Sequence, residues 1–224
     1  KNKKKLKKDF FENCIIKKNI NKNNLFIWGD SLGAHLYPGI SEKYGKNYNI
    51  LQRTADRCKP FIPISNLKSC DLINSQILDE ILKTKPNKDF LSGYWDKENL
   101  KRIKKITDVL RKNNINQIYL FGPSPRWHDP LPKILLKKYK IYRKIPLYLG
   151  DKNHEKNFEL DKQFNNFSKK NKLKYISPMK ILCQKDYKCL TRVDNQPDSI
   201  TSWDENHFTK KASIFIFSKF IDKK

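Results

Sequence analysis

Short apolar runs alternate along the chain with longer segments in which apolar residues recur every three or four positions. The short runs have the length of β-strands, and the longer segments have the periodicity of amphipathic helices. The predicted strands are Leu25–Gly29, Tyr48–Arg53, Phe90–Tyr94, Gln117–Gly122 and Lys174–Ser177. The predicted helices are Leu72–Leu82, Glu98–Asn113, Lys133–Tyr139, Glu155–Asn171 and Lys210–Ile221. This alternation favours an α/β fold in which a parallel sheet of about five strands carries helices on both faces.

The chain has the organisation of one domain. Its 224 residues, of which 38% are hydrophobic, suffice for a sizeable core, and no internal repeat divides them. We expect residues 1–20 to form a basic linker and residues 21–224 to form the domain. The segment Gly122–Tyr148 is rich in proline, and we expect it to form an irregular loop beside the functional site.

A formal net charge of +25 suggests an acidic partner, and nucleic acid is the first candidate. Only seven of the 48 basic residues are Arg, however, and Arg is the side chain best suited to bidentate contacts with phosphates and bases. The Lys residues are scattered through the sequence, and no helix-turn-helix, finger or RNP-like string is present. We therefore expect no nucleic-acid partner. A basic surface also suits anionic glycans or an anionic membrane surface.

The start of the chain bears on its cellular context. No apolar run approaches the roughly 18 residues of a membrane-spanning helix, and no signal-peptide pattern is present. Because the sequence begins at Lys1 rather than Met, we expect it to be a piece of a longer protein. The Lys1–Lys8 run would suit a juxtamembrane tether, although a plain solvated linker is the simpler interpretation.

The first candidate for chemistry is the string Gly29-Asp30-Ser31-Leu32, which directly follows an apolar run of strand length. A serine just past the carboxyl end of a strand lies where open α/β sheets place their reactive groups. The backbone N–H of Ser31, at the start of a following helix, could donate to a developing oxyanion. Alone, such a string is more often a simple turn.

The second candidate is Asp204-Glu205-Asn206-His207, which precedes the last predicted helix. Asp and His three residues apart can both face the serine. His207 would then accept the Ser31 proton, and Asp204 would hold the imidazole tautomer and stabilise its charged form. A helix start with a solvated His is the alternative. The joint occurrence of both strings favours a catalytic set of Ser31, Asp204 and His207.

The two end strings resemble the first and last blocks of the SGNH/GDSL esterase superfamily. The strings between them narrow the resemblance to the SGNH domain fused to the C-terminus of acyltransferase-3 type membrane proteins, and it extends from about Asn24 to Phe220. These strings are Asp30-Ser31-x-x-x-His35-Leu36-Tyr37-Pro38, Thr54-x-x-x-Cys58-x-Pro60, Gly122-Pro123-x-Pro125-x-Trp127, Leu131-Pro132 and the pair Cys183 and Cys189.

The resemblance implies a three-layer, flavodoxin-like fold. It also implies an activity: transfer of an acyl group, usually acetyl, to a bacterial surface polysaccharide, with Ser31, Asp204 and His207 catalytic and no cofactor. The implied partners are a membrane-embedded acyltransferase domain that supplies the acyl group and a glycan that accepts it. The implied location is the periplasmic face of the inner membrane, to which the domain would be tethered.

The sequence departs from the superfamily at the oxyanion hole. The third block normally supplies an Asn after a strand, and the matching segment here reads Leu91-Ser92-Gly93-Tyr94-Trp95-Asp96. The Gly of the second block is also missing, although a backbone N–H at Asp56 could replace it because backbone donors need no particular side chain. We therefore expect the backbone N–H groups of Ser31 and Asp56, with Trp95 near the position of the missing Asn, to form the hole.

Four of the five cysteines form two pairs that are close in sequence. We predict the disulfides Cys58–Cys70 and Cys183–Cys189, with Cys14 left over, which implies an oxidising compartment. Reduced cytosolic thiols are the alternative. A zinc site is disfavoured because neither pair has the usual two-to-four spacing and the four His residues are dispersed, so we predict no metal.

Two further side chains are candidates for substrate contact. His35 lies four residues after Ser31 and could line the site, and a hydrogen-bonded structural His is an equal alternative. Trp127 could contact a sugar ring, and packing inside a loop core is the alternative. For the whole domain, two other functions stay open: an esterase or deacetylase that transfers the acyl group to water, and a non-catalytic glycan-binding module.

Overall fold

A single parallel sheet organises the computed structural model, which describes residues 19–64, 69–196 and 198–222. Its strand order is β2-β1-β3-β4-β6, and each strand is parallel to its neighbours. The strands are β1 (Asn23–Gly29), β2 (Tyr48–Thr54), β3 (Lys88–Ser92), β4 (Ile118–Phe121) and β6 (Lys174–Ile176). This is the flavodoxin-like, doubly wound order, which places functional groups at the carboxyl ends of the strands. The predicted fold class and all five predicted strands are confirmed.

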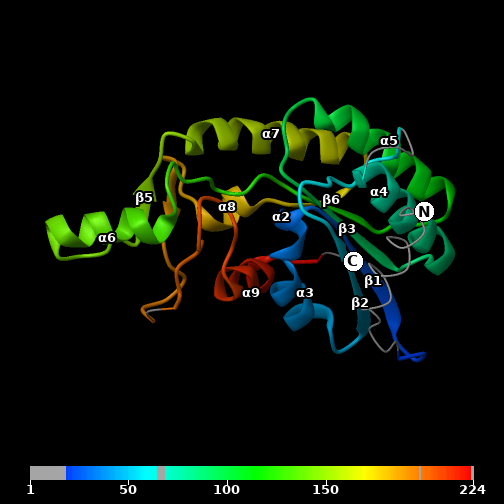
Figure 1. Ribbon diagram of the computed structural model, residues 1–224, viewed down its shortest axis with the longest axis horizontal. Coiled ribbons are helices and arrows are strands. Elements are labelled where there is room, and N and C mark those ends of the chain that lie inside the picture. The colour runs from blue at the N-terminus through cyan, green and yellow to red at the C-terminus, as the bar shows by residue number, and fades with distance from the viewer. Residues whose placement is uncertain (1–18, 65–68, 197, 223–224) are drawn as a thin grey trace, which may run out of the picture.

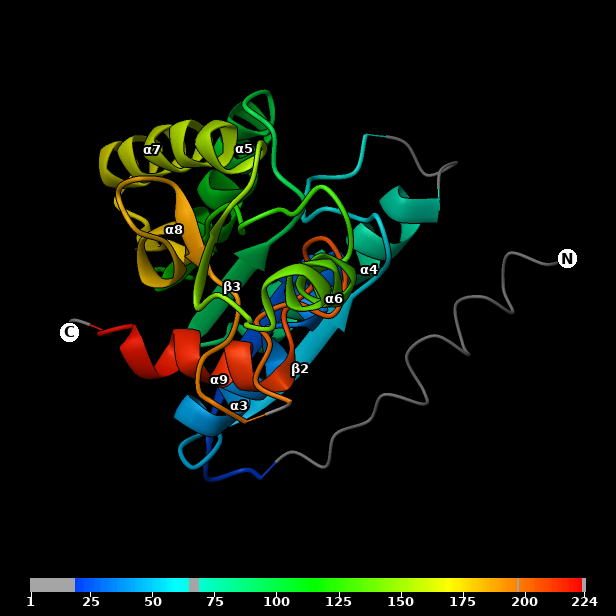
Figure 2. The ribbon, with the colours of Figure 1, turned by 90° about the vertical axis from the view of Figure 1, so that its left-hand side faces the viewer.

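Helices cover both faces of the sheet and give the three expected layers (Figures 1 and 2). One face is covered by α4 (Ser69–Thr84), α5 (Asn99–Lys112) and α7 (His154–Lys170). The other is covered by α3 (Tyr37–Tyr44) and α9 (Lys210–Lys219). Short helices α2 (Ser31–Ala34) and α8 (Pro178–Leu182) complete the layers.

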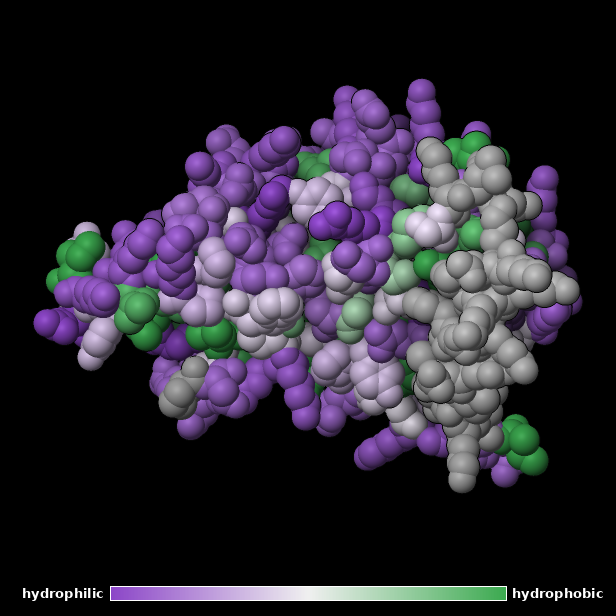
Figure 3. Space-filling view, in the orientation of Figure 1, coloured by the Kyte–Doolittle hydropathy of each residue, from purple (hydrophilic) through white to green (hydrophobic). Residues whose placement is uncertain are grey.

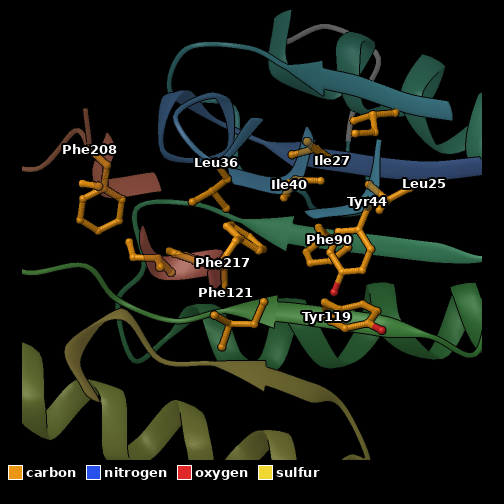
Figure 4. Packing of buried hydrophobic residues seen from close by; sticks show 14 of the residues in the cluster. Leu25, Ile27, Leu36, Ile40, Tyr44, Phe90, Tyr119, Phe121, Phe208 and Phe217 are labelled. Carbon is orange, nitrogen blue, oxygen red and sulfur yellow. The ribbon is translucent and has the colours of Figure 1, made fainter. Parts of the chain in front are cut away.

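Strand β1 shows why the sheet is buried. Leu25 and Ile27 pack into the core beneath α3 and α9, part of which Figure 4 shows. Phe26 and Trp28 point to the opposite core beneath α4 and α5. Successive side chains of a strand point to opposite faces, so an apolar run without alternation is typical of a strand covered on both sides. The indole N–H, the one polar group of the Trp28 side chain, donates to Oδ1 of Asn74 at 2.9 Å.

Contact between α3 and α9 joins two parts of the chain that are 174 residues apart in the sequence. Gly39 lies so close to α9 that a Cβ there would be 2.3 Å from the carbonyl oxygen of Ser213. The hydroxyl of Ser213 accepts from the Gly39 N–H at 3.0 Å and donates to the carbonyl of Leu36 at 3.2 Å. The packing therefore holds the segment that precedes α9 next to the segment that follows β1.

The region after β4 differs from the prediction. The helix predicted at Lys133–Tyr139 is present as the longer α6 (Leu131–Tyr142), so less of Gly122–Tyr148 is irregular than its proline content predicts. A small antiparallel sheet of β5 (Tyr148–Gly150) and β7 (Lys188–Leu190) is also present. It was not predicted, because strands of three residues are too short to show an alternation of apolar and polar positions. Helix α6 lies at one end of the molecule, where apolar side chains are exposed on an otherwise polar face (Figure 3).

Both predicted disulfides are present, Cys58–Cys70 and Cys183–Cys189. Cys14, the Lys1–Lys8 run and nearly all of the predicted linker 1–20 lie outside the described residues. Within the described ranges, no helix has the length and apolar character needed to cross a membrane. The same residues contain no cluster of three or more potential metal-binding side chains.

Asp89 in β3 is a carboxyl group whose two oxygens are buried without a hydrogen-bond partner among the described residues. Burial raises its pKa to about 8, whereas an unfolded Asp titrates near about 4. Between these pH values the folded state binds a proton that the unfolded state has lost. The contribution of Asp89 to the free energy of unfolding therefore falls as pH rises, by about 1.4 kcal/mol per pH unit.

We expect Asp89→Asn to abolish the fall in the free energy of unfolding that this carboxyl causes as pH rises. Urea unfolding at several pH values between about 4 and 8 would measure the effect. Relative to the wild type, the free energy of unfolding of the variant should increase as pH rises. Asp79→Asn, at an exposed carboxyl of α4, is the matched control and should keep the wild-type slope. A slope unchanged by Asp89→Asn would mean that this carboxyl is ionised in the folded protein.

Candidate active site

Ser31 lies where β1 ends, as the sequence predicted. Gly29 is the last residue of β1, Asp30 caps the next helix, and Ser31 is the first residue of α2. Gly29 pairs with Thr54 of β2 and Ser92 of β3, so the carboxyl ends of three strands meet beside the serine. A Cβ on Gly29 would lie 2.3 Å from the carbonyl oxygen of Ser92. The close approach of β1 and β3 thus explains why this position is glycine.

The three predicted catalytic side chains form one hydrogen-bonded chain. Nε2 of His207 is 2.9 Å from Oγ of Ser31, and Nδ1 of His207 is 2.6 Å from Oδ2 of Asp204. With the Nδ1 proton donated to the carboxylate, Nε2 is left as the acceptor for the serine proton. Residues 176 positions apart are therefore arranged as a nucleophile, a base and a group that orients the base.

Backbone donors hold Asp204 in its ionised form. Its Oδ1 accepts from the N–H groups of Asn206 at 2.8 Å and His207 at 2.7 Å. Burial alone raises the pKa of Asp204, but these donors and the imidazole outweigh burial and bring the pKa below its usual value. Asp204 is therefore a carboxylate at neutral pH, suited to stabilise a charged imidazole.

Aromatic packing and two backbone bonds fix the turn that carries His207. Trp203 stacks on the imidazole, with ring centres 5.2 Å apart and planes 21° apart, while 58% of Trp203 is exposed. The segment after β4 supports the same turn, because the N–H of Trp127 donates to the Glu205 carbonyl and that of Leu131 donates to the Asp204 carbonyl. The turn is therefore anchored from both sides.

Asp30 is a functional residue that the sequence analysis did not single out. Its buried carboxylate accepts from the N–H of Leu32 at 2.9 Å and from the N–H of Tyr94 at 2.8 Å. It thus ties the serine turn to the loop after β3. Burial, opposed by the Leu32 N–H, raises the pKa of Asp30 to about 6. An Asp directly before a helix is a common N-cap, which is the signal that could have revealed it.

The predicted oxyanion donors have different outcomes. Trp95 is wrong as a donor, because it is only 6% exposed and its indole N–H already donates to the Phe121 carbonyl at 2.7 Å. The N–H of Ser31 lies in the first turn of α2, where no intrahelical acceptor exists. The turn containing Asp56 is held beside it, since the Ala55 N–H donates to the Gly29 carbonyl at 3.1 Å. Donation by the Asp56 N–H stays a prediction.

Both candidates for substrate contact pack against other side chains of the protein, and Nε2 of His35 is buried without a hydrogen-bond partner among the described residues. His35 uses Nδ1 to accept the backbone N–H of Phe208 at 3.1 Å, and its ring lies 4.5 Å from that of Phe208. Burial and the neighbouring His207 bring the pKa of His35 well below its usual value, so its imidazole is neutral. Trp127 is 2% exposed and packs with Leu131 and Met179, which assigns it to a core beneath α6.

His35 is therefore a positioning residue for the turn that carries His207. We expect His35→Leu to lower kcat for an acetyl ester by roughly ten- to a hundredfold with little change in KM, because the Phe208 N–H loses its acceptor and the base shifts. His35→Asn keeps an acceptor near the position of Nδ1 and should recover most of the activity. Equal losses in both variants would indicate a packing role alone.

Comparisons with known proteins agree with this geometry. A family model for the SGNH domain fused to AT3 domains matches residues 1–222. The periplasmic domain of a lipopolysaccharide acetyltransferase from Salmonella ser. Paratyphi A is 30% identical with a TM-score of 0.77, over 93% of this chain and 85% of that one. A search of curated proteins found no significant match.

Two more distant structures share the fold. A GDSL-like lipase from Bacteroides thetaiotaomicron is 10% identical with a TM-score of 0.55, over 95% of this chain and 93% of that one. Est24, a carbohydrate acetylesterase from Sinorhizobium meliloti, is 12% identical with a TM-score of 0.51, over 88% of this chain and 95% of that one. The family match and the Salmonella relative together show that the chain belongs to the SGNH domains that are fused to AT3 domains.

Proposed function

We propose that this chain is an O-acyltransferase domain that moves an acyl group, in the first instance acetyl, to a hydroxyl of a bacterial cell-surface polysaccharide. The observation that carries the proposal is the hydrogen-bonded chain from Ser31 through His207 to Asp204. Membership of a family fused to AT3 domains and the similarity to the periplasmic domain of a lipopolysaccharide acetyltransferase support acyl transfer as the reaction.

The first step forms an acyl-serine. Nε2 of His207 takes the hydroxyl proton as Oγ of Ser31 attacks the carbonyl carbon of the acyl donor. The bond from that carbon to the leaving group of the donor breaks, and the leaving group takes the proton from His207. Asp204 stabilises the charged imidazole between these events, which its lowered pKa permits.

The second step transfers the acyl group to the glycan. His207 takes the proton of a sugar hydroxyl, whose oxygen attacks the carbonyl carbon of the acyl-serine. The ester bond to Oγ breaks, and Ser31 recovers its proton from His207. The negative charge that forms on the carbonyl oxygen in both steps would be stabilised by the N–H of Ser31 and, we propose, by that of Asp56.

The proposed partners follow from this reaction. The acyl group would come from a membrane-embedded acyltransferase domain, and the acceptor would be a glycan. The proposed location is the periplasmic face of the inner membrane, which agrees with the two disulfides because such bonds persist in oxidising compartments. No step requires a cofactor.

Hydrolysis uses the same residues with water as the acceptor, so the acceptor decides between transferase and esterase. We expect incubation with 4-nitrophenyl acetate and an oligosaccharide of the native polysaccharide to yield acetylated sugar, detected by mass spectrometry. Product formation should require Ser31. If the oligosaccharide leaves hydrolysis unchanged and is never acetylated, the chain is an esterase. If the Ser31 hydroxyl does not react with a fluorophosphonate and no ester is cleaved, it is a non-catalytic module.

A further inference from the structure

A cavity of about 370 Å³ lies directly beside the proposed catalytic residues. Its walls are the amino-terminal half of α7, the loop after β3 and the segment after β4. Leu32 and Asn206 line it, and these residues are the direct neighbours of Ser31 and His207 in the sequence. Its volume is within the range of about 300–1,000 Å³ that is typical of small-molecule sites.

Two residues that line the cavity each have a buried polar atom with no hydrogen-bond partner among the described residues. These atoms are Oγ of Ser124, a residue that is only 7% exposed, and Oε1 of Gln163. The amide of Asn157, which also lines the cavity, donates to the Ser124 carbonyl at 2.9 Å. Because buried polar groups are almost always paired, we expect these side chains to turn toward the cavity when an occupant brings its own donors and acceptors. A hydroxylated ligand meets that need.

The remaining walls suit a ring. Leu32, Trp95, Pro123 and Leu160 supply apolar surface around the polar atoms, and Tyr94 stands at the exposed side. A cavity with apolar and aromatic walls and a few placed polar groups orients a ligand that has both kinds of surface. A sugar ring has this character, since its C–H faces are apolar and its hydroxyls radiate from the edge.

Positive charge lines the cavity. Lys97, Arg126 and Lys156 face it, and in the described ranges neither lysine has an ion-pair partner. The two acidic side chains of the lining are already paired, Asp96 with Lys59 at 3.2 Å and Glu159 with Lys162 at 2.5 Å. The unpaired charge of the cavity is therefore positive, which favours an anionic substituent such as a carboxylate or a phosphate.

We propose that this cavity is the acceptor subsite and that it binds an acidic sugar unit of the glycan. The proposal rests on the proposed function, since it takes the sugar to be the acyl acceptor. The hydroxyls of the ring pair with Ser124 and Gln163, and the acidic group faces Lys97, Arg126 and Lys156. An alkyl chain is the poorer occupant, because it would leave both buried polar atoms unpaired.

Direct binding tests the subsite without relying on catalysis. We expect the chain to bind methyl glucuronide more tightly than methyl glucoside, and high salt to remove the difference, as saturation-transfer NMR titrations would show. Replacing the polar atoms in Ser124→Ala and Gln163→Met should weaken glucuronide binding by about tenfold each. Asn166→Ala, on an exposed part of α7, is the matched control and should bind as the wild type.

Three results would overturn the inference: no binding of the acidic sugar, binding unaffected by both variants, or an altered preference between 4-nitrophenyl acetate and butyrate in Gln163→Met. The last would identify an acyl-chain pocket. The proposed function fails separately. If Ser31→Ala leaves ester cleavage intact while sugar binding still requires Ser124 and Gln163, the subsite binds sugar and the catalytic assignment is wrong.

Discussion

Ser31→Ala is expected to lower acyl transfer by at least about three orders of magnitude. The variant removes the oxygen that we propose forms the acyl intermediate, and the chain of hydrogen bonds through His207 to Asp204 then has no nucleophile at its end. Single-turnover and steady-state rates with an acetyl ester would measure the loss. Circular dichroism should show an unchanged fold, because among the described residues the Ser31 hydroxyl is hydrogen-bonded to His207 alone.

The same assay shows whether Ser31 and His207 act together in one catalytic step or contribute to the rate independently. His207→Ala should lose about as much activity as Ser31→Ala, and the double variant should lose no more than either single one, because residues that act as a unit are not additive. Ser218→Ala, at an exposed serine of α9, is the control and should retain wild-type rates. Additive losses would show that Ser31 and His207 act in separate steps.

The second large effect is expected from Gly29→Ala. The new Cβ would be 2.3 Å from the Ser92 carbonyl oxygen, a backbone atom that can move only if β1 and β3 separate. We expect the free energy of unfolding to fall by about 1–3 kcal/mol or more, as for other overpacked cores. Activity should fall as well, because Asp30 and Ser31 directly follow the displaced strand end.

Gly150→Ala is the matched control. A Cβ at Gly150 would have only the side chain of Lys188 nearby, at 3.8 Å, which is ordinary contact. Urea unfolding of both variants should therefore show a large loss for Gly29→Ala and almost none for Gly150→Ala. Equal stabilities of the two variants would mean that β1 and β3 tolerate a larger separation than the structure shows.

Much of the site could be predicted because its parts are local patterns at strand and helix ends. The strand before Gly29 is a continuous apolar run, and Asp204 and His207 are three residues apart on one turn. In a parallel sheet such segments meet at the carboxyl edge, so the order of motifs along the chain indicated their meeting in space. The disulfide pairs likewise closed short loops in the sequence and are present in the structure.

The remaining features depend on contacts that no local pattern encodes. The indole N–H of Trp95 is used by the carbonyl of Phe121, 26 residues away, and only the packing of β4 shows this. Trp127 belongs to a third core cluster beneath α6, which the proline-rich composition of its segment concealed. The acceptor cavity could not be predicted either, because Ser124 and Gln163 share it only after α7 has packed on the sheet.

Detection of an acyl-serine would show whether Ser31 is the nucleophile. The chain is incubated with 4-nitrophenyl acetate, quenched in acid, digested and analysed by mass spectrometry. Neutral hydroxylamine then distinguishes an ester on serine from the amides that the many lysines can form. We expect one hydroxylamine-labile acetyl group, on the peptide that contains Ser31, and its absence in Ser31→Ala. Acetyl transfer at the wild-type rate in Ser31→Ala, or a labile acetyl group on another residue, would contradict this expectation.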